Sequence, residues 1–130
     1  MKISHLAILT SDLEGLRNFY CTYFMAKSNK MYVNPKKQFS SYFLTFENGD
    51  CSIELMNKPT YVSNIDREKR DKSGLAHFAI SVGSKKAVDE LTEQLRASGI
   101  EIIGEPRQTG DGFYESVIAD PDGNIVEITI

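Results

Sequence analysis

One short pattern occurs twice in this chain and limits how the chain can fold. Ser4-His5-Leu6-Ala7-Ile8 returns as Ala76-His77-Phe78-Ala79-Ile80: a small residue, His, an apolar residue, Ala and Ile. The sequence contains two His residues, and both stand in this pattern, 77 − 5 = 72 positions apart. In a chain of 130 residues, a repeat at this distance predicts two similar halves.

Two Glu residues keep nearly the same separation. Glu54 lies within Ser52-Ile53-Glu54-Leu55 and Glu127 within Ile125-Val126-Glu127-Ile128, so each carboxylate interrupts an apolar strand pattern. The two Glu residues are 127 − 54 = 73 positions apart. Each half therefore opens on a strand His and closes on a strand Glu. Because strand side chains alternate between two faces, each of these residues faces away from the more apolar side of its strand.

A buried, ionised Glu without a partner costs on the order of several kcal/mol. Two such Glu residues facing two His residues need compensation, which a divalent cation supplies. Imidazole and carboxylate ligands suit Zn, Fe, Ni, Co or Mn. We therefore predict that His5, Glu54, His77 and Glu127 bind one divalent metal ion. In the alternative reading, each Glu lies on a solvent face and each His is a hydrogen-bonded core residue; the repeated spacing favours the metal.

The remaining pattern predicts βαβββ twice, an α+β fold, with modules at 1–57 and 74–130 and a linker at 58–73. Ser11 is expected to cap the first helix in a capping box with Glu14, and Ser84 to cap the second, which Gly99 ends. Asn48-Gly49 predicts a hairpin turn. The expected strands are 2–9, 30–35, 39–46, 51–56, 75–82, 101–103, 113–118 and 125–130, with a helix from 11 to about 25 and a loop at 104–112.

The linker alternates in charge from Asp66 to Lys72. This pattern predicts a solvated connector, with a lid over the site as the alternative. The net charge is −3 and no basic patch is present, which argues against a nucleic-acid partner. No signal pattern or membrane-length apolar run occurs, so we expect a cytoplasmic protein without a membrane partner. Cys21 and Cys51 lack metal-type spacing and are expected to be buried or partly buried reduced thiols.

These motifs resemble the vicinal oxygen chelate superfamily, which holds glyoxalase I, methylmalonyl-CoA epimerase, extradiol dioxygenases and bleomycin resistance proteins. The resemblance covers the whole chain, as one glyoxalase-like domain at 1–130. It implies a fold of paired βαβββ modules curled around a metal cleft, and a homodimer. Its carriers are His5-Leu6-Ala7-Ile8, Asp12-Leu13 with Phe19-Tyr20, Gly74-Leu75-Ala76-His77-Phe78-Ala79-Ile80 and Asp120-Pro121-Asp122-Gly123-Asn124-Ile125-Val126-Glu127.

Within the superfamily, a fourth ligand at the position of Glu54 is typical of glyoxalase I and the epimerase. Bacterial glyoxalase I has Glu there, so the resemblance implies a metal-dependent lyase or isomerase that acts on a hemithioacetal of a 2-oxoaldehyde, or a similar small molecule, through an enediolate. The same resemblance makes Glu127 the first candidate for the catalytic base, with Glu54 as its counterpart in the other module.

Two positions depart from the glyoxalase I pattern. Leu9 stands where glyoxalase I has a glutathione-binding Arg, and Lys58 stands where an Asn is usual. A thiol other than glutathione, or another chelating substrate, therefore fits the sequence as well. The alternatives are an epimerase, a dioxygenase or a metal-free antibiotic-binding module. In such a module, aromatic residues would stack on the ligand: Phe39, Tyr42, Phe113 and Tyr114.

Overall fold

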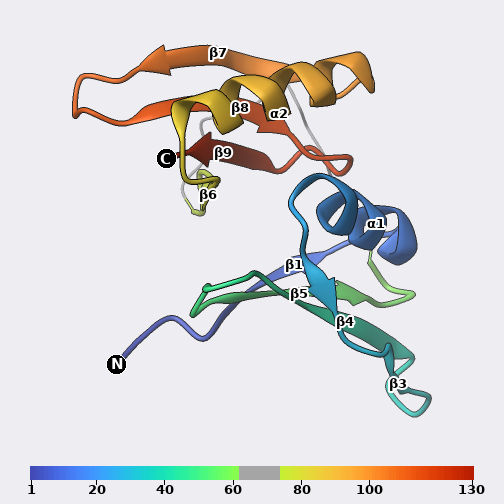
Figure 1. Ribbon diagram of the computed structural model, residues 1–130. Helices are drawn as coiled ribbons and strands as arrows, with labels where there is room; N and C mark the ends of the chain where they lie inside the picture. The colour runs from blue at the N-terminus through green and yellow to red at the C-terminus, as the bar shows by residue number, and fades with distance from the viewer. Residues whose placement is uncertain (62–73) are drawn as a thin grey trace. The chain divides into compact units, whose positions relative to one another are not determined.

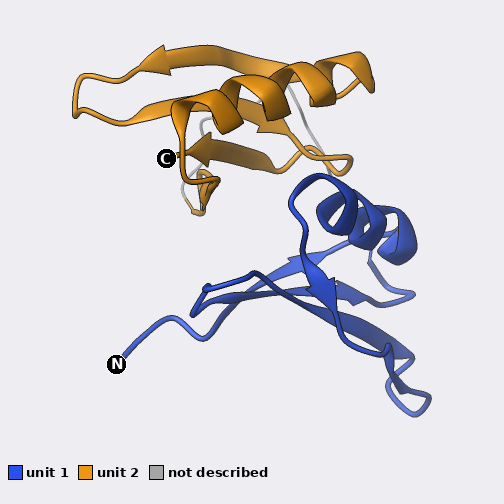
Figure 2. Ribbon diagram, in the orientation of Figure 1, with its two compact units in different colours: residues 1–64 blue, residues 65–130 orange. Residues whose placement is uncertain are grey.

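A computed structural model describes residues 1–61 and 74–130 of the chain (Figure 1). The chain divides into two compact units, Met1–Asn64 and Ile65–Ile130 (Figure 2). Of the linker predicted at 58–73, only the first four residues belong to the described part, so the predicted module boundaries remain predictions. In the described ranges, no helix is long and apolar enough to cross a membrane.

Unit 1 is a mixed sheet with one helix. Its elements are β1 (His5–Leu9), α1 (Leu13–Tyr23), β2 (Lys27–Ser28), β3 (Tyr32–Asn34), β4 (Phe39–Thr45) and β5 (Ser52–Asn57). The strand order is β1-β5-β4-β2, and β3 pairs with β4. β1 runs parallel to β5, and the other pairs are antiparallel. α1 packs on the sheet through β4, β5 and β2 (Figure 1).

Unit 2 repeats this plan with one strand fewer, because the described residues of unit 2 include no separate counterpart of the short strand β2. Its elements are β6 (Phe78–Ser81), α2 (Lys85–Ala97), β7 (Ile102–Gln108), β8 (Tyr114–Ala119) and β9 (Ile125–Thr129). The strand order is β6-β9-β8-β7, with β6 parallel to β9. α2 packs on β7, β8 and β9. The expected α+β fold is confirmed, and each unit follows the βαβββ order apart from the addition of β2.

The sequence repeat is also a repeat of strand register. In unit 1, Ala7 is the Cα partner of Glu54 across the parallel pair β1 and β5. In unit 2, Ala79 is the partner of Glu127 across β6 and β9. The two Ala residues each follow a His by two positions, so each His shares a strand face with the Ala that pairs with Glu. The two units thus place their His and Glu on equivalent backbone positions.

The core of each unit lies between its helix and its sheet. In unit 1, α1 meets apolar side chains of β4 and β5; the fully buried apolar residues are Leu16 and Tyr20 of α1, Leu44 of β4 and Leu55 of β5. In unit 2 the fully buried apolar residues are Val88, Leu95, Ile118, Val126 and Ile128. A buried hydroxyl pair, Thr92 with Ser116, links α2 to β8 at 2.7 Å between the two oxygens.

The cap of α1 differs from the prediction. Asp12, not Ser11, is the N-cap: its Oδ1 accepts a hydrogen bond of 2.9 Å from the backbone N–H of Gly15. A Cβ on Gly15 would collide with the Asp12 carboxylate, so the glycine makes room for the cap. The predictions for α2 are confirmed, because Ser84 accepts from the N–H of Ala87 and Gly99 follows the helix with φ of 79°.

The two neighbouring cap candidates give a direct test. Replacing Asp12 by Ala should lower the free energy of unfolding by about 1 kcal/mol, because the N–H of Gly15 loses its acceptor. Replacing the exposed Ser11 by Ala should change it by less than about 0.5 kcal/mol. Urea unfolding followed by circular dichroism measures both. A larger loss at Ser11 than at Asp12 would contradict the observed cap.

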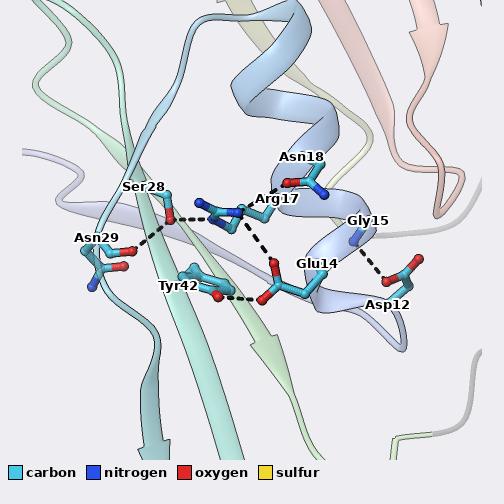
Figure 3. Close-up of polar contacts among 8 residues, drawn as sticks. All are labelled: Asp12, Glu14, Gly15, Arg17, Asn18, Ser28, Asn29 and Tyr42. Carbon is cyan, nitrogen blue, oxygen red and sulfur yellow. Dashed lines mark hydrogen bonds and ion pairs between the residues drawn. The ribbon is translucent and has the colours of Figure 1, made fainter.

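Glu14 has a different role from the predicted one (Figure 3). Its carboxylate accepts a hydrogen bond of 2.5 Å from the hydroxyl of Tyr42 on β4, which raises the pKa of Tyr42 above its ordinary value. The guanidinium of Arg17 lies 5.0 Å from the centre of the Tyr42 ring, and its Nε donates to Ser28. This polar network joins α1 to β4 and β2.

The loop predicted at 104–112 is wrong at its start, because β7 continues to Gln108. β7 is the edge strand of its sheet. Pro106 has no N–H to donate, and on the free side of an edge strand no sheet hydrogen bond is lost as a result. The pairing with β8 shifts register on both sides of Gly104.

The predicted turn at Asn48-Gly49 does join β4 to β5: the N–H of Gly49 donates to the carbonyl of Phe46, and Asn48 has φ of 60°.

Candidate metal centre

Unit 1 brings His5 and Glu54 together. The residues stand on the neighbouring parallel strands β1 and β5, and Nε2 of His5 lies 3.8 Å from Oε2 of Glu54. The His5 side chain is 42% exposed and that of Glu54 15% exposed. The pair is therefore accessible, while its carboxylate is largely withdrawn from solvent.

Unit 2 brings His77 and Glu127 together in the same way. Glu127 stands on β9, and Nε2 of His77 lies 3.3 Å from its Oε2. His77 directly precedes β6, which begins at Phe78, so the strand expected from residue 75 starts later. The side chains of His77 and Glu127 are 45% and 20% exposed, close to the values for the first pair.

Both carboxylates lie on the sheet face away from the helix. Ile53 and Leu55, on either side of Glu54, are buried. Val126 and Ile128, on either side of Glu127, are fully buried. The alternation predicted from the sequence is thus present in both closing strands. Each unit buries one face beneath its helix and presents its His–Glu pair on the other.

The two pairs have a geometry that a metal ion can use. Atoms that each bind an ion of the size of Zn²⁺ at about 2.1 Å lie at most about 4.2 Å apart. The His–Glu distances of 3.8 and 3.3 Å both fall within this limit. Among the described residues, no Lys or Arg side chain forms an ion pair with Glu54 or Glu127. The donor sets, one imidazole nitrogen and one carboxylate oxygen each, fit a borderline divalent ion.

Each unit by itself supplies two of the four residues predicted as ligands. Across residues 1–61 and 74–130, no three His, Cys, Asp or Glu side chains gather into a metal-binding group. The structure therefore brings together the pairs, and the complete four-residue set belongs to the functional proposal below.

Comparison with known proteins assigns the family. The profile of the Glyoxalase/Bleomycin resistance protein/Dioxygenase superfamily matches residues 2–128. The chain belongs to this superfamily. Because the match spans nearly the whole chain, it includes both His–Glu pairs. It also agrees with the family resemblance and with the fold.

Relatives in the superfamily have different activities. The chain is 27% identical to lactoylglutathione lyase of Haemophilus influenzae, over 98% of the chain and 90% of that protein. It is also 27% identical to biphenyl-2,3-diol 1,2-dioxygenase 2 of Rhodococcus globerulus, over 99% of the chain and 62% of that protein. Glyoxalase I of Zea mays has the same fold, with a TM-score of 0.78 at 24% identity; the chain spans 98% of its own length and 44% of the maize chain.

Side chains on the same sheet faces as the two pairs were missed by sequence reasoning. Phe43 on β4 is the Cα partner of Glu54, and its ring centre lies 5.6 Å from that of His5 in an edge-on contact. In unit 2, Glu115 on β8 pairs with Thr129 and accepts from Arg107 of β7 at 3.3 Å. Alternation along the strand predicted at 113–118 could have indicated Glu115; Arg107 was hidden by the loop prediction.

Proposed function

We propose that the protein is a metal-dependent isomerase or lyase of the glyoxalase I type. Its substrate would be a hemithioacetal or a similar molecule with vicinal oxygens. The observation that carries the proposal is the occurrence of two His–Glu pairs at equivalent register in the two units. The similarity to lactoylglutathione lyase, which spans almost the whole chain, supports the same activity.

The proposed ligands are His5, Glu54, His77 and Glu127, binding one divalent ion per site: Ni, Zn, Co, Fe or Mn. When bound, such an ion polarises the substrate carbonyl, acidifies the adjacent C–H bond and stabilises negative charge on the two vicinal oxygens. The two pairs come from one chain or from two chains of a homodimer. Mixing a His5→Ala chain with a His77→Ala chain distinguishes these cases, since activity returns only when the site is shared between chains.

Glu127 is the proposed base. Its carboxylate takes the proton from the hemithioacetal carbon that bears the hydroxyl group and the sulfur. It returns a proton to the neighbouring carbonyl carbon, so that the ketone becomes an alcohol and the hemithioacetal becomes a thioester. His77, 3.3 Å away, orients this carboxylate. Glu54 is its counterpart in unit 1 and faces the substrate beside His5.

Metal titration of chelator-stripped protein tests the ligand set. Isothermal titration should show binding of one ion per four-residue site. Replacing Glu54 by Gln should raise the dissociation constant of the metal ion by about 10-fold or more, because a neutral amide replaces a charged ligand. Replacing Glu115 by Gln is the matched control, because Glu115 pairs with Arg107 and lies outside both His–Glu pairs. Failure of every tested ion to bind would refute the proposal.

Dioxygenase activity is the second candidate, because nearly the whole of this chain is similar to a part, 62%, of the Rhodococcus dioxygenase. Uptake of oxygen by iron-loaded protein with a catechol would support it over isomerisation. An antibiotic-binding role has less support from the aromatic residues. Tyr42 is buried beneath α1, and Tyr114 donates to Asp89 while Lys85 lies over its ring.

A further inference from the structure

The equivalent register of the units allows their exposed sheet faces to be compared position by position. On the face that carries each His–Glu pair, the next cross-strand pair along the sheet is Leu9 with Met56 in unit 1. The equivalent pair in unit 2 is Ser81 with Thr129. The same backbone positions therefore carry two apolar side chains beside one His–Glu pair and two hydroxyl side chains beside the other.

The third strand on these faces extends the contrast. Met56 has Ser41 as its partner on β4, whereas Thr129 has the charged Glu115 on β8. Phe43 adds an aromatic ring beside Glu54, where unit 2 has the smaller apolar residue Val117 beside Glu127. The face of unit 1 thus combines a thioether, a leucine and a phenyl ring next to its pair, while the face of unit 2 carries Val117, hydroxyl groups and the ion pair of Glu115 with Arg107.

These apolar side chains remain accessible. Leu9 is 39% exposed although it stands at the end of a sheet strand whose opposite face is buried. Met56 and Phe43 are partly exposed. The His5 and Phe43 rings form a T-shaped contact, so the apolar surface begins at the pair itself. It ends toward Lys58, whose Nζ lies 5.9 Å from the centre of the Phe39 ring.

We propose that Leu9, Met56 and Phe43 form an apolar subsite that selects a substrate with an uncharged aryl or alkyl group next to its vicinal oxygens. This inference rests on the proposed function, which puts the reacting oxygens at the His–Glu pairs. A charged substituent would lose its hydration beside Leu9 and Met56 without gaining a partner. An aryl or alkyl group instead removes apolar surface from water on both sides of the contact.

The occupant is a small molecule because of where the surface lies. Glu54, which is mostly withdrawn from solvent, directly adjoins two of the three apolar side chains, through Phe43 across the sheet and Met56 two positions along β5. A small molecule whose oxygens lie at the Glu54 carboxylate can therefore also place an apolar group against Leu9, Met56 and Phe43. A second copy of the chain covering this surface is the competing occupant, and the test below separates the two.

The test uses two hydroxamates, which present vicinal oxygens and differ in their apolar part. Benzohydroxamate carries a phenyl ring and acetohydroxamate a methyl group. Zinc-loaded protein should bind benzohydroxamate about 10-fold or more tightly than acetohydroxamate. The double variant Leu9→Ser, Met56→Thr, which copies the pair of unit 2, should remove this preference. The control Val33→Ser changes an exposed apolar residue of β3 and should keep it.

A second readout does not require metal. With methyl-labelled methionine, benzohydroxamate at high concentration should shift the Met56 signal in metal-free protein, while the exposed Met25 and Met31 serve as internal references. If no metal binds yet Met56 responds, the proposed function fails and the subsite stands. If Met56 does not respond, with or without zinc, the subsite is refuted. A Met56 signal that moves with protein concentration alone would instead assign the surface to a second copy, and would also refute the proposal.

Discussion

Replacing Glu127 by Gln is expected to lower the rate of hemithioacetal isomerisation by about 10²- to 10⁴-fold, the usual contribution of a positioned general base. An amide keeps the size and an oxygen ligand of the side chain but does not accept a proton. The loss should therefore appear in kcat and should persist at metal concentrations high enough to keep the site filled despite the weaker binding expected of an amide ligand. The assay is the absorbance of the thioester product, measured on metal-loaded protein with a neutral aryl thiol and, separately, with glutathione.

The equivalent substitution Glu54→Gln is the internal comparison. Both carboxylates occupy the same register position, lie beside a His and are mostly withdrawn from solvent. If Glu127 is the base, Glu54→Gln should act mainly through weaker metal binding and be overcome by excess metal. A large loss of kcat at Glu54 with little effect at Glu127 would reverse the two roles. Equal rates in the parent and both variants would refute carboxylate catalysis altogether.

The larger features of the fold could be predicted from the sequence because each depends on a strong local pattern. Alternation around Glu54 and Glu127 identified the faces of β5 and β9, since a carboxylate between two aliphatic neighbours marks the side away from the core. The repeat of the His and Glu spacings predicted two units of the same order. That equivalence appears in the structure as a common register.

The errors arose where competing signals lie close together. Ser11 and Asp12 are both good N-cap residues, and the glycine that makes room for the Asp12 carboxylate decided between them. In β7, Gly104 and Pro106 are typical of a loop, but an edge strand tolerates both because one side has no partner. Which residue caps α1, and whether residues 104–108 form a strand or a loop, depends on a neighbouring strand or side chain. The local sequence alone does not carry that information.

The candidate site was predictable as two pairs but not in its surroundings. Spacing alone indicated His5 with Glu54 and His77 with Glu127, and each pair is formed within a unit. The difference between the two faces could be recognised only from the strand register. Leu9 and Met56 are 47 positions apart in the chain and meet only across β1 and β5. The feature that bears on substrate choice is therefore a property of strand pairing.

Truncating Leu55 to Ala should destabilise the protein by about 2–5 kcal/mol, a large part of the usual free energy of unfolding of a small protein. Leu55 is fully buried between α1 and the sheet, with Ile8 of β1 and Tyr42 of β4 as its cross-strand partners. Removing its branched end leaves a cavity that these neighbours, which are themselves held in the sheet, fill only in part.

Leu9→Ala is the matched control, because it deletes the same atoms on the adjoining strand. Leu9 is 39% exposed on the opposite face, so the expected cost is about 1 kcal/mol or less. Urea unfolding followed by far-ultraviolet circular dichroism measures both variants, and equal slopes in urea would show that the same surface is exposed on unfolding. If the two truncations cost the same, Leu9 would be as well packed as Leu55. The side chain proposed to meet the substrate would then be part of the core instead.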